Sequence, residues 1–164
     1  MSNQLHGNDP LCFEDLHIGQ RFVSGTHLID EGQIKEFATQ FDPQPFHLDA
    51  EAAKNSFFKG LVASGWHTAA ISMRLLVRSG LPIAGGIIGM GAEIAWPHPT
   101  RPGDTLHVES EIQDLKRSRS RPGRGIATVR SETRNQRSEV VQVLIAKLVV
   151  PSKDSTSEAN QKSF

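Results

Sequence analysis

Asp42 and His47 stand five residues apart in a stretch of chain that Pro43 and Pro45 stiffen. The segment 60–67 follows and opens a long apolar run, so this acid/base pair lies close in sequence to a helix start. A carboxylate can take a proton from water, an imidazole can hold that water, and N–H groups at a helix start can receive a developing oxyanion. A hydration needs these groups, and the pattern indicates a catalytic site.

Length and composition limit the classes of protein. The chain has 164 residues, 37% of them hydrophobic, which suffices for one ordinary core. Lys+Arg and Asp+Glu both total 18, so no net charge draws the protein to nucleic acid or to an anionic membrane. The chain has one cysteine, Cys12, which excludes an internal disulfide, and it has no signal-like segment. We expect a cytoplasmic protein with no nucleic-acid or membrane partner.

Composition also separates the ends of the chain from its body. Residues 1–11 are polar and carry no period, and residues 152–164 have almost nothing to bury. We therefore predict a single domain over 12–151 between two flexible tails.

The first half of the body predicts a strand followed by helices. Residues 20–29 alternate and carry β-branched side chains, which favours a strand. Asp30 is placed to cap a helix over 31–40, and Pro43 and Pro45 end that helix and force an extended passage. Asp42 and His47 would then lie at the rim of a turn between two helices, since Asp49 can cap a short second helix over 50–54.

A helix that is apolar nearly all round is predicted over 64–78, and other structure must wrap it. Strand-like runs follow at 86–96, 105–115, 125–135 and 139–150. The glycine-rich run 85–91 leads into a strand, so we expect a tight approach of that strand to the helix, and no nucleotide loop. One long helix held in a curved antiparallel sheet is the α+β architecture that this order favours.

Three segments, 41–76, 96–106 and 117–122, resemble the MaoC-like dehydratases, which are relatives of the (R)-specific enoyl-CoA hydratases. The resemblance covers about 13–151. It implies the hotdog fold, an antiparallel sheet wrapped around one long central helix, and a homodimer or a larger assembly of dimers. It also implies an acyl-CoA substrate and no cofactor beyond the CoA that the substrate carries.

The motif of the family's hydratases resembles Gly-Asp-x-Asn-Pro-apolar-His, and its catalytic pair falls on Asp42 and His47. Phe41 stands in place of the glycine and Gln44 in place of the asparagine, so the loop and the acyl pocket should differ from those of the better-known hydratases. A serine that lines the site in some members falls at Met73 by ungapped counting, and its role is not transferred.

By resemblance, Asp42 and His47 hold a water over C3 of a trans-2-enoyl thioester, and the backbone N–H of Gly65 receives the thioester oxyanion. From the sequence, Ser64 is first an N-cap and then a possible substrate contact, and Trp66 is either core or pocket wall. His67 should be a packed, neutral histidine, because the helix dipole disfavours its cation there.

The basic run at 117–124 has two readings. It is a solvated hairpin, or Arg119 and Arg121 meet the phosphates of coenzyme A. No cluster of histidine, cysteine or aspartate has the spacing of metal ligands, so we predict no metal.

The function that these residues favour is an acyl-CoA hydratase/dehydratase acting by Asp/His acid-base catalysis. A hotdog thioesterase shares the fold and the oxyanion site, so it remains an alternative. A non-catalytic acyl-thioester-binding subunit is a second alternative, because of Phe41 and Gln44.

Overall fold

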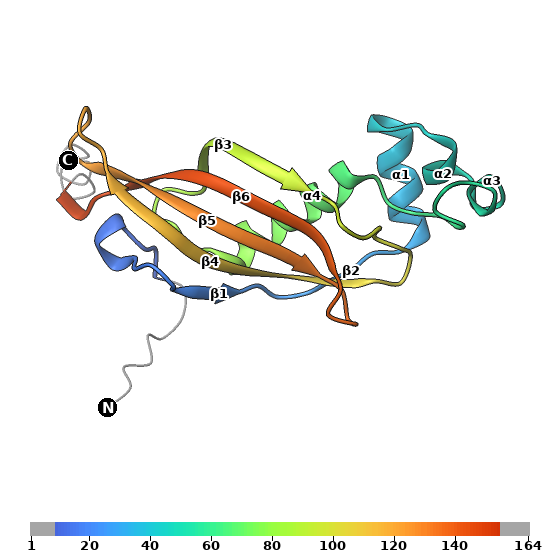
Figure 1. The fold of residues 1–164 in the computed structure, drawn as a ribbon, viewed down its shortest axis with the longest axis horizontal. Coiled ribbons are helices and arrows are strands. Elements are labelled where there is room, and N and C mark those ends of the chain that lie inside the picture. The colour runs from blue at the N-terminus through green and yellow to red at the C-terminus, as the bar shows by residue number, and fades with distance from the viewer. Residues whose placement is uncertain (1–8, 155–164) are drawn as a thin grey trace, which may run out of the picture.

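The computed structural model describes residues 9–154, and Figure 1 shows their arrangement. The helical elements are η1 (Phe13–Asp15), α1 (Glu31–Phe41), α2 (Pro45–Leu48), α3 (Ala50–Lys54), α4 (Gly65–Leu75) and the π-helical η2 (Leu76–Gly80). The strands are β1 (Arg21–Val23), β2 (His27–Leu28), β3 (Ile88–Ala95), β4 (Thr105–Arg117), β5 (Arg124–Arg134) and β6 (Val140–Pro151).

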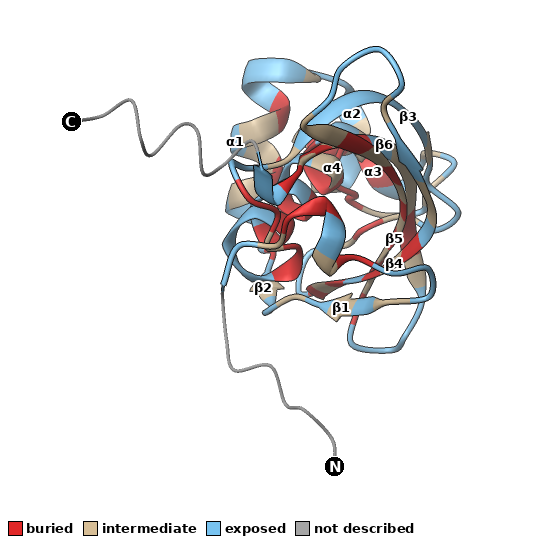
Figure 2. Ribbon diagram, turned by 90° about the vertical axis from the view of Figure 1, so that its left-hand side faces the viewer, coloured by how far each residue is buried: buried red, intermediate tan, exposed pale blue. Residues whose placement is uncertain are grey.

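The strands form one antiparallel sheet that curves around α4 (Figure 2). Its order is β1-β4-β5-β6-β3, and β2 also pairs with β4. Alternate residues along β5 are buried, as a sheet with one covered face requires. The core beneath α4 comes from the helix and from three neighbouring strands, and includes Ile71, Leu75, Leu106, Val108, Ile112, Ala127, Val129, Leu148 and Val150. The predicted α+β hotdog fold is confirmed.

Two buried hydroxyl pairs fix α4 against the rest of the domain. The Thr68 hydroxyl donates to that of Thr100 over 2.9 Å, and Ser72 shares a 2.6 Å hydrogen bond with Thr133 on β5. Because all four side chains are buried, each pair satisfies polar groups that would otherwise destabilise the core. These contacts at Thr68 and Ser72 help to set the position of the helix start at Gly65.

The predicted caps are found where the sequence placed them. The Asp30 carboxylate accepts the N–H of Gln33 over 2.8 Å, and the Asp49 carboxylate accepts two N–H groups at the start of α3. Ser64 caps α4 by accepting the N–H of Trp66. These side chains satisfy donors that the first turn of a helix leaves unpaired, and so define where each helix begins.

Two predictions of local structure are wrong. Pro45 begins the short helix α2 instead of extending the chain, because a proline is well tolerated at the first helical position. The strand expected over 20–29 is broken into β1 and β2, since the Ser24 hydroxyl accepts the N–H of Val108 in the ladder. The predicted central helix is present, and after Leu75 it continues in π-helical form as η2.

The glycine-rich run leads into strand β3, as expected, but the reason given for its glycines is wrong. A Cβ added at Gly89 or Gly91 would meet no atom within 4 Å, so these positions do not approach α4. Gly85 and Gly86 have φ of 74° and 95°, a conformation that favours glycine, and they form the turn before the strand.

Residues 1–8 and 155–164, the larger parts of the two expected tails, lie outside the described residues. Leu11 pairs with Ile83, and Ser152 is buried, so the ordered domain includes these two residues as well. In the described part of the chain, no helix is both long enough and apolar enough to span a membrane.

Candidate active site

A cavity of about 510 Å³ opens at the start of α4, between the α1–α3 segment and the loop that joins β3 to β4. It contains the predicted acid/base pair and the predicted oxyanion site. Its lining includes Asp42, Gln44, Phe46, His47, Phe58, Ser64, Gly65, Trp66, Trp96, His98 and Arg101.

Asp42 and His47 face each other, with 3.3 Å between Asp42 Oδ2 and His47 Nε2. His47 lies on α2 and is buried, and its Nδ1 is 2.7 Å from the carbonyl oxygen of Val62. A carbonyl only accepts hydrogen bonds, so Nδ1 carries a proton and Nε2 is the ring nitrogen that faces Asp42. A water bound beside this pair can form hydrogen bonds with both Nε2 and the carboxylate.

The pKa of Asp42 lies below its ordinary value, which keeps the carboxylate ionised at neutral pH. Burial acts in the opposite direction and raises the pKa, but hydrogen bonds from Ser64 and Gln44 and the proximity of His47 outweigh it. The Gln44 amide donates to Asp42 Oδ1 over 2.7 Å. Gln44, which stands in place of the motif's asparagine, therefore supplies a hydrogen-bond donor to the proposed base, Asp42.

Ser64 links the base to the helix start. Its hydroxyl oxygen accepts the N–H of Trp66 over 3.2 Å, and its hydroxyl group donates to the carboxylate of Asp42. In the described part of the chain, the N–H of the next residue, Gly65, donates to no protein acceptor. A free N–H in the first turn of a helix, lining a cavity, suits a developing negative charge.

Glycine is also the only residue type that fits at position 65. A Cβ there would lie 2.7 Å from Cε2 of Trp96, well inside ordinary contact. The Trp96 indole is fixed by a 3.0 Å hydrogen bond from its Nε1 to the buried Gln142 of β6. Trp66 stacks edge-on against Trp96 and is 61% exposed, so it belongs to the pocket wall and not to the core.

Other predicted positions lie outside the cavity. His67 is buried and stacks on Phe37 at 4.5 Å, and burial, with a smaller effect of His27, lowers its pKa to about 4. It is therefore the packed, neutral histidine that the sequence predicts. Met73 stands at the position where ungapped counting places the family's serine, and it does not line the cavity.

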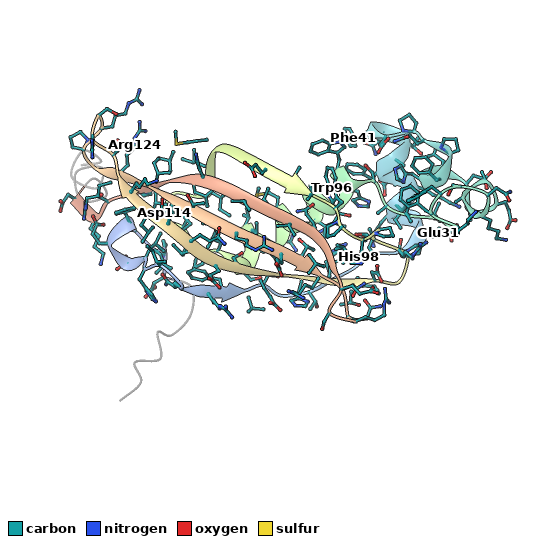
Figure 3. All side chains as sticks on the ribbon, in the orientation of Figure 1. Glu31, Phe41, Trp96, His98, Asp114 and Arg124 are labelled. Carbon is teal, nitrogen blue, oxygen red and sulfur yellow. The ribbon has the colours of Figure 1, made fainter. Side chains whose placement is uncertain are left out.

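Arg119 and Arg121 are also absent from the cavity lining. They lie on the hairpin between β4 and β5, which is at the end of the protomer opposite to α1–α3 (Figure 1). In Figure 3, Arg124 at the base of this hairpin stands far from Phe41 and His98. Within one protomer, the hairpin and the acid/base pair are not brought together.

Sequence reasoning assigned no role to Trp96, His98 and Arg101, three of the six residues that the loop between β3 and β4 contributes to the cavity. The loop belongs to the segment 96–106, whose resemblance to the family was the signal that could have drawn attention to it. In residues 9–154, no group of three or more histidine, cysteine, aspartate or glutamate side chains could hold a metal ion.

Comparison with known proteins assigns the class. The family model described as MaoC like domain matches residues 15–135, and the chain belongs to this family. Its relatives include MaoC-like dehydratases, and the chain is accordingly a dehydratase-type enzyme of the hotdog fold.

Individual relatives and solved structures resemble the chain over most of its length. The chain is 35% identical over 127 residues to an uncharacterized protein, YdeM, of Bacillus subtilis, covering 76% of this chain and 87% of YdeM. The crystal structure of the MaoC-like dehydratase from Rhodospirillum rubrum is 60% identical, with a TM-score of 0.86, and the match covers 87% of this chain and 98% of that one. The R-hydratase PhaJ1 from Pseudomonas aeruginosa is 27% identical, with a TM-score of 0.71 and 88% of each chain covered.

Proposed function

We propose that the protein is an acyl-CoA hydratase/dehydratase, which adds water to a trans-2-enoyl thioester or removes it from a 3-hydroxyacyl thioester. The observation that carries this proposal is the geometry of Asp42 and His47. An ionised carboxylate and an imidazole whose Nδ1 is held by a backbone carbonyl lie 3.3 Å apart, beside a free N–H at a helix start. Membership of a dehydratase family supports the same chemistry.

In the hydration direction, a water donates one hydrogen bond to Asp42 and is held by a second hydrogen bond with His47 Nε2. Asp42 takes the proton from the water as its oxygen forms a bond to C3, and the electron pair of the C2=C3 double bond moves toward the thioester carbonyl. The proton then reaches C2, which restores the carbonyl and leaves Asp42 ionised. Dehydration is the same path in reverse, so a single acid/base pair serves both directions.

The N–H of Gly65 is the proposed donor that stabilises the negative charge on the thioester oxygen. Because this donor is fixed by the helix and lies in a cavity with aromatic walls, it needs no reorganisation when the charge appears. The loss of one such donor typically costs on the order of 3 kcal/mol of transition-state stabilisation. The proposed site therefore combines a base, a water-holding group and an oxyanion donor.

An assay with crotonyl-CoA tests the proposal. We expect the absorbance of the enoyl thioester to fall without release of free thiol. Thiol release by the wild type would place the protein among the thioesterases. If neither signal appears with short, long or carboxylated enoyl thioesters that bind, the protein is a binding subunit and the proposal is wrong.

We also propose that the active form is a homodimer joined through β3. This strand is at the edge of the sheet and almost entirely exposed, with Ile88 and Met90 55% and 65% exposed. An uncovered, partly apolar edge favours pairing with a second copy. Sedimentation should give a dimer for the wild type and a monomer for Met90→Lys, and a monomeric wild type would contradict this assembly.

A further inference from the structure

Arg101 brings a positive charge to the lining of the cavity that holds Asp42 and His47. Throughout residues 9–154, no carboxylate lies within 4.0 Å of its guanidinium group, whereas five of the eleven arginines in this range form an ion pair with a nearby acid. The neighbouring walls are aromatic, formed by Phe46, Phe58 and Trp96. A fixed, uncompensated cation in such surroundings calls for an anion from outside the protein.

The structure holds the backbone of Arg101 firmly in place. The N–H of Arg101 donates to the Asp104 carboxylate over 2.8 Å, and Gly103, with φ of 87°, closes the turn between them. Asp104 is only 2% exposed, and its other oxygen pairs with Arg137 over 3.1 Å. Since Asp104 is already engaged, it anchors the turn and does not neutralise the Arg101 side chain.

The guanidinium group is oriented as well. Nη2 of Arg101 donates to the carbonyl oxygen of Phe58 over 2.8 Å, and Nη1 lies 3.4 Å from the place where a Cβ on Gly60 would stand. The loop after α3 thus supports one edge of the guanidinium. Five N–H donors belong to an arginine side chain, so most of them stay available to oxygens in the cavity.

On this basis we propose that Arg101 binds an anionic group of the thioester ligand. The assignment rests on the proposed function, because it takes the ligand of this cavity to be an acyl thioester. The chemistry is that of a guanidinium with carboxylate or phosphate oxygens. The source is either a carboxylate on the acyl chain or a phosphate of the carrier, and Arg101 takes the role that the sequence offered to Arg119 and Arg121.

The protein contains a direct reporter of cavity occupancy. Its two tryptophans, Trp66 and Trp96, both line the cavity, so quenching of intrinsic fluorescence measures ligand binding without any turnover. Saturated, unreactive thioesters serve as probes. Butyryl-CoA carries phosphates only, butyryl-pantetheine carries no negative charge, and glutaryl-CoA carries both phosphates and an acyl carboxylate.

The variant is Arg101→Gln, which removes the positive charge and keeps a polar side chain. If the anion is a carrier phosphate, both CoA ligands should bind about 10-fold to 100-fold more weakly, and butyryl-pantetheine should be unaffected. If it is an acyl carboxylate, only glutaryl-CoA should lose affinity by that factor. Arg119→Gln, on the distant hairpin, is the matched control and should leave all three affinities unchanged.

The assignment is overturned if Arg101→Gln leaves both CoA ligands unchanged, or if it weakens butyryl-pantetheine as much as butyryl-CoA. The second result, accompanied by a lower melting temperature, would mean that Arg101 only ties its loop to Phe58. Failure of the wild type to bind any probe also overturns it. Binding to the wild type without hydration of crotonyl-CoA would instead refute the proposed reaction and support the anion site.

Discussion

Replacement of Gly65 by alanine tests the packing at the proposed oxyanion donor. The new Cβ would stand 2.7 Å and 2.8 Å from two ring atoms of Trp96, whereas carbon atoms in contact are ordinarily about 3.5–4.0 Å apart. The indole must therefore move by roughly 1 Å. Its hydrogen bond to Gln142, 3.0 Å long, would be broken or strongly bent by that movement.

The expected cost follows from these contacts. Overpacking costs typically about 1–3 kcal/mol, and the alanine returns up to about 1 kcal/mol through its better helix propensity. We expect Gly65→Ala to lower the free energy of unfolding by about 1–2 kcal/mol, which is a fall in Tm of about 2–8 °C for a chain of this size. The displaced indole should also reduce kcat/KM, because it narrows the cavity beside the Gly65 N–H.

Thermal unfolding followed by circular dichroism measures the loss, and Gly25→Ala is the control. A Cβ at Gly25 would meet only Ser79 Oγ, at an ordinary 3.5 Å. In a Trp96→Ala background the Gly65→Ala change should cost almost nothing, because the clashing ring is gone. The reasoning is refuted if Gly65→Ala leaves Tm and kcat/KM unchanged, or if its cost is the same with and without the indole.

Ser64→Ala removes an N-cap and a donor to Asp42, so we expect a loss of about 1 kcal/mol in unfolding free energy. It should also raise the pKa of Asp42, since the lost bond favoured the carboxylate, and the acidic limb of the kcat/KM profile should move to higher pH; Ser64→Thr should restore it, and an unmoved limb would contradict the link. His67, with its pKa lowered from 6.5 to about 4, binds its proton more weakly in the folded than in the unfolded state. The contribution of neutral His67 to the free energy of unfolding is therefore fully present above pH 6.5, and the free energy of unfolding should fall by up to about 3 kcal/mol as the pH drops toward 4. Urea unfolding at pH 7 and pH 5 should show this loss in the wild type and a smaller one in His67→Phe, and equal pH dependence in the two proteins would disprove the assignment.

The sequence predicts the features that local chemistry controls. Asp30, Asp49 and Ser64 cap helices because a short polar side chain before an apolar run has few other roles. Asp42 and His47 meet because they are joined by a short segment with restricted backbone freedom. The exact path of that segment was beyond local rules, since a proline fits both an extended chain and the first position of a helix.

Long-range packing decides what the sequence misses. Trp96 is held in the cavity wall by a hydrogen bond to Gln142, which is 46 positions away in the chain. Arg101 is likewise held by the carbonyl oxygen of Phe58, which lies on a different loop. Arginine clusters are easily seen in a sequence, but the hairpin with Arg119 and Arg121 points away from α2 because strands β4 and β5 run the full length of the sheet. A single arginine on a loop, held by a buried turn, gives no comparable signal.

Hydration of crotonyl-CoA by the wild type and by Asp42→Asn tests the central claim most directly. The asparagine keeps the size of the side chain but cannot take a proton from water. The account predicts loss of the enoyl absorbance without free thiol in the wild type, and at least a roughly 100-fold lower kcat in the variant, with binding by tryptophan fluorescence preserved. Hydration that proceeds equally well in both proteins would contradict it.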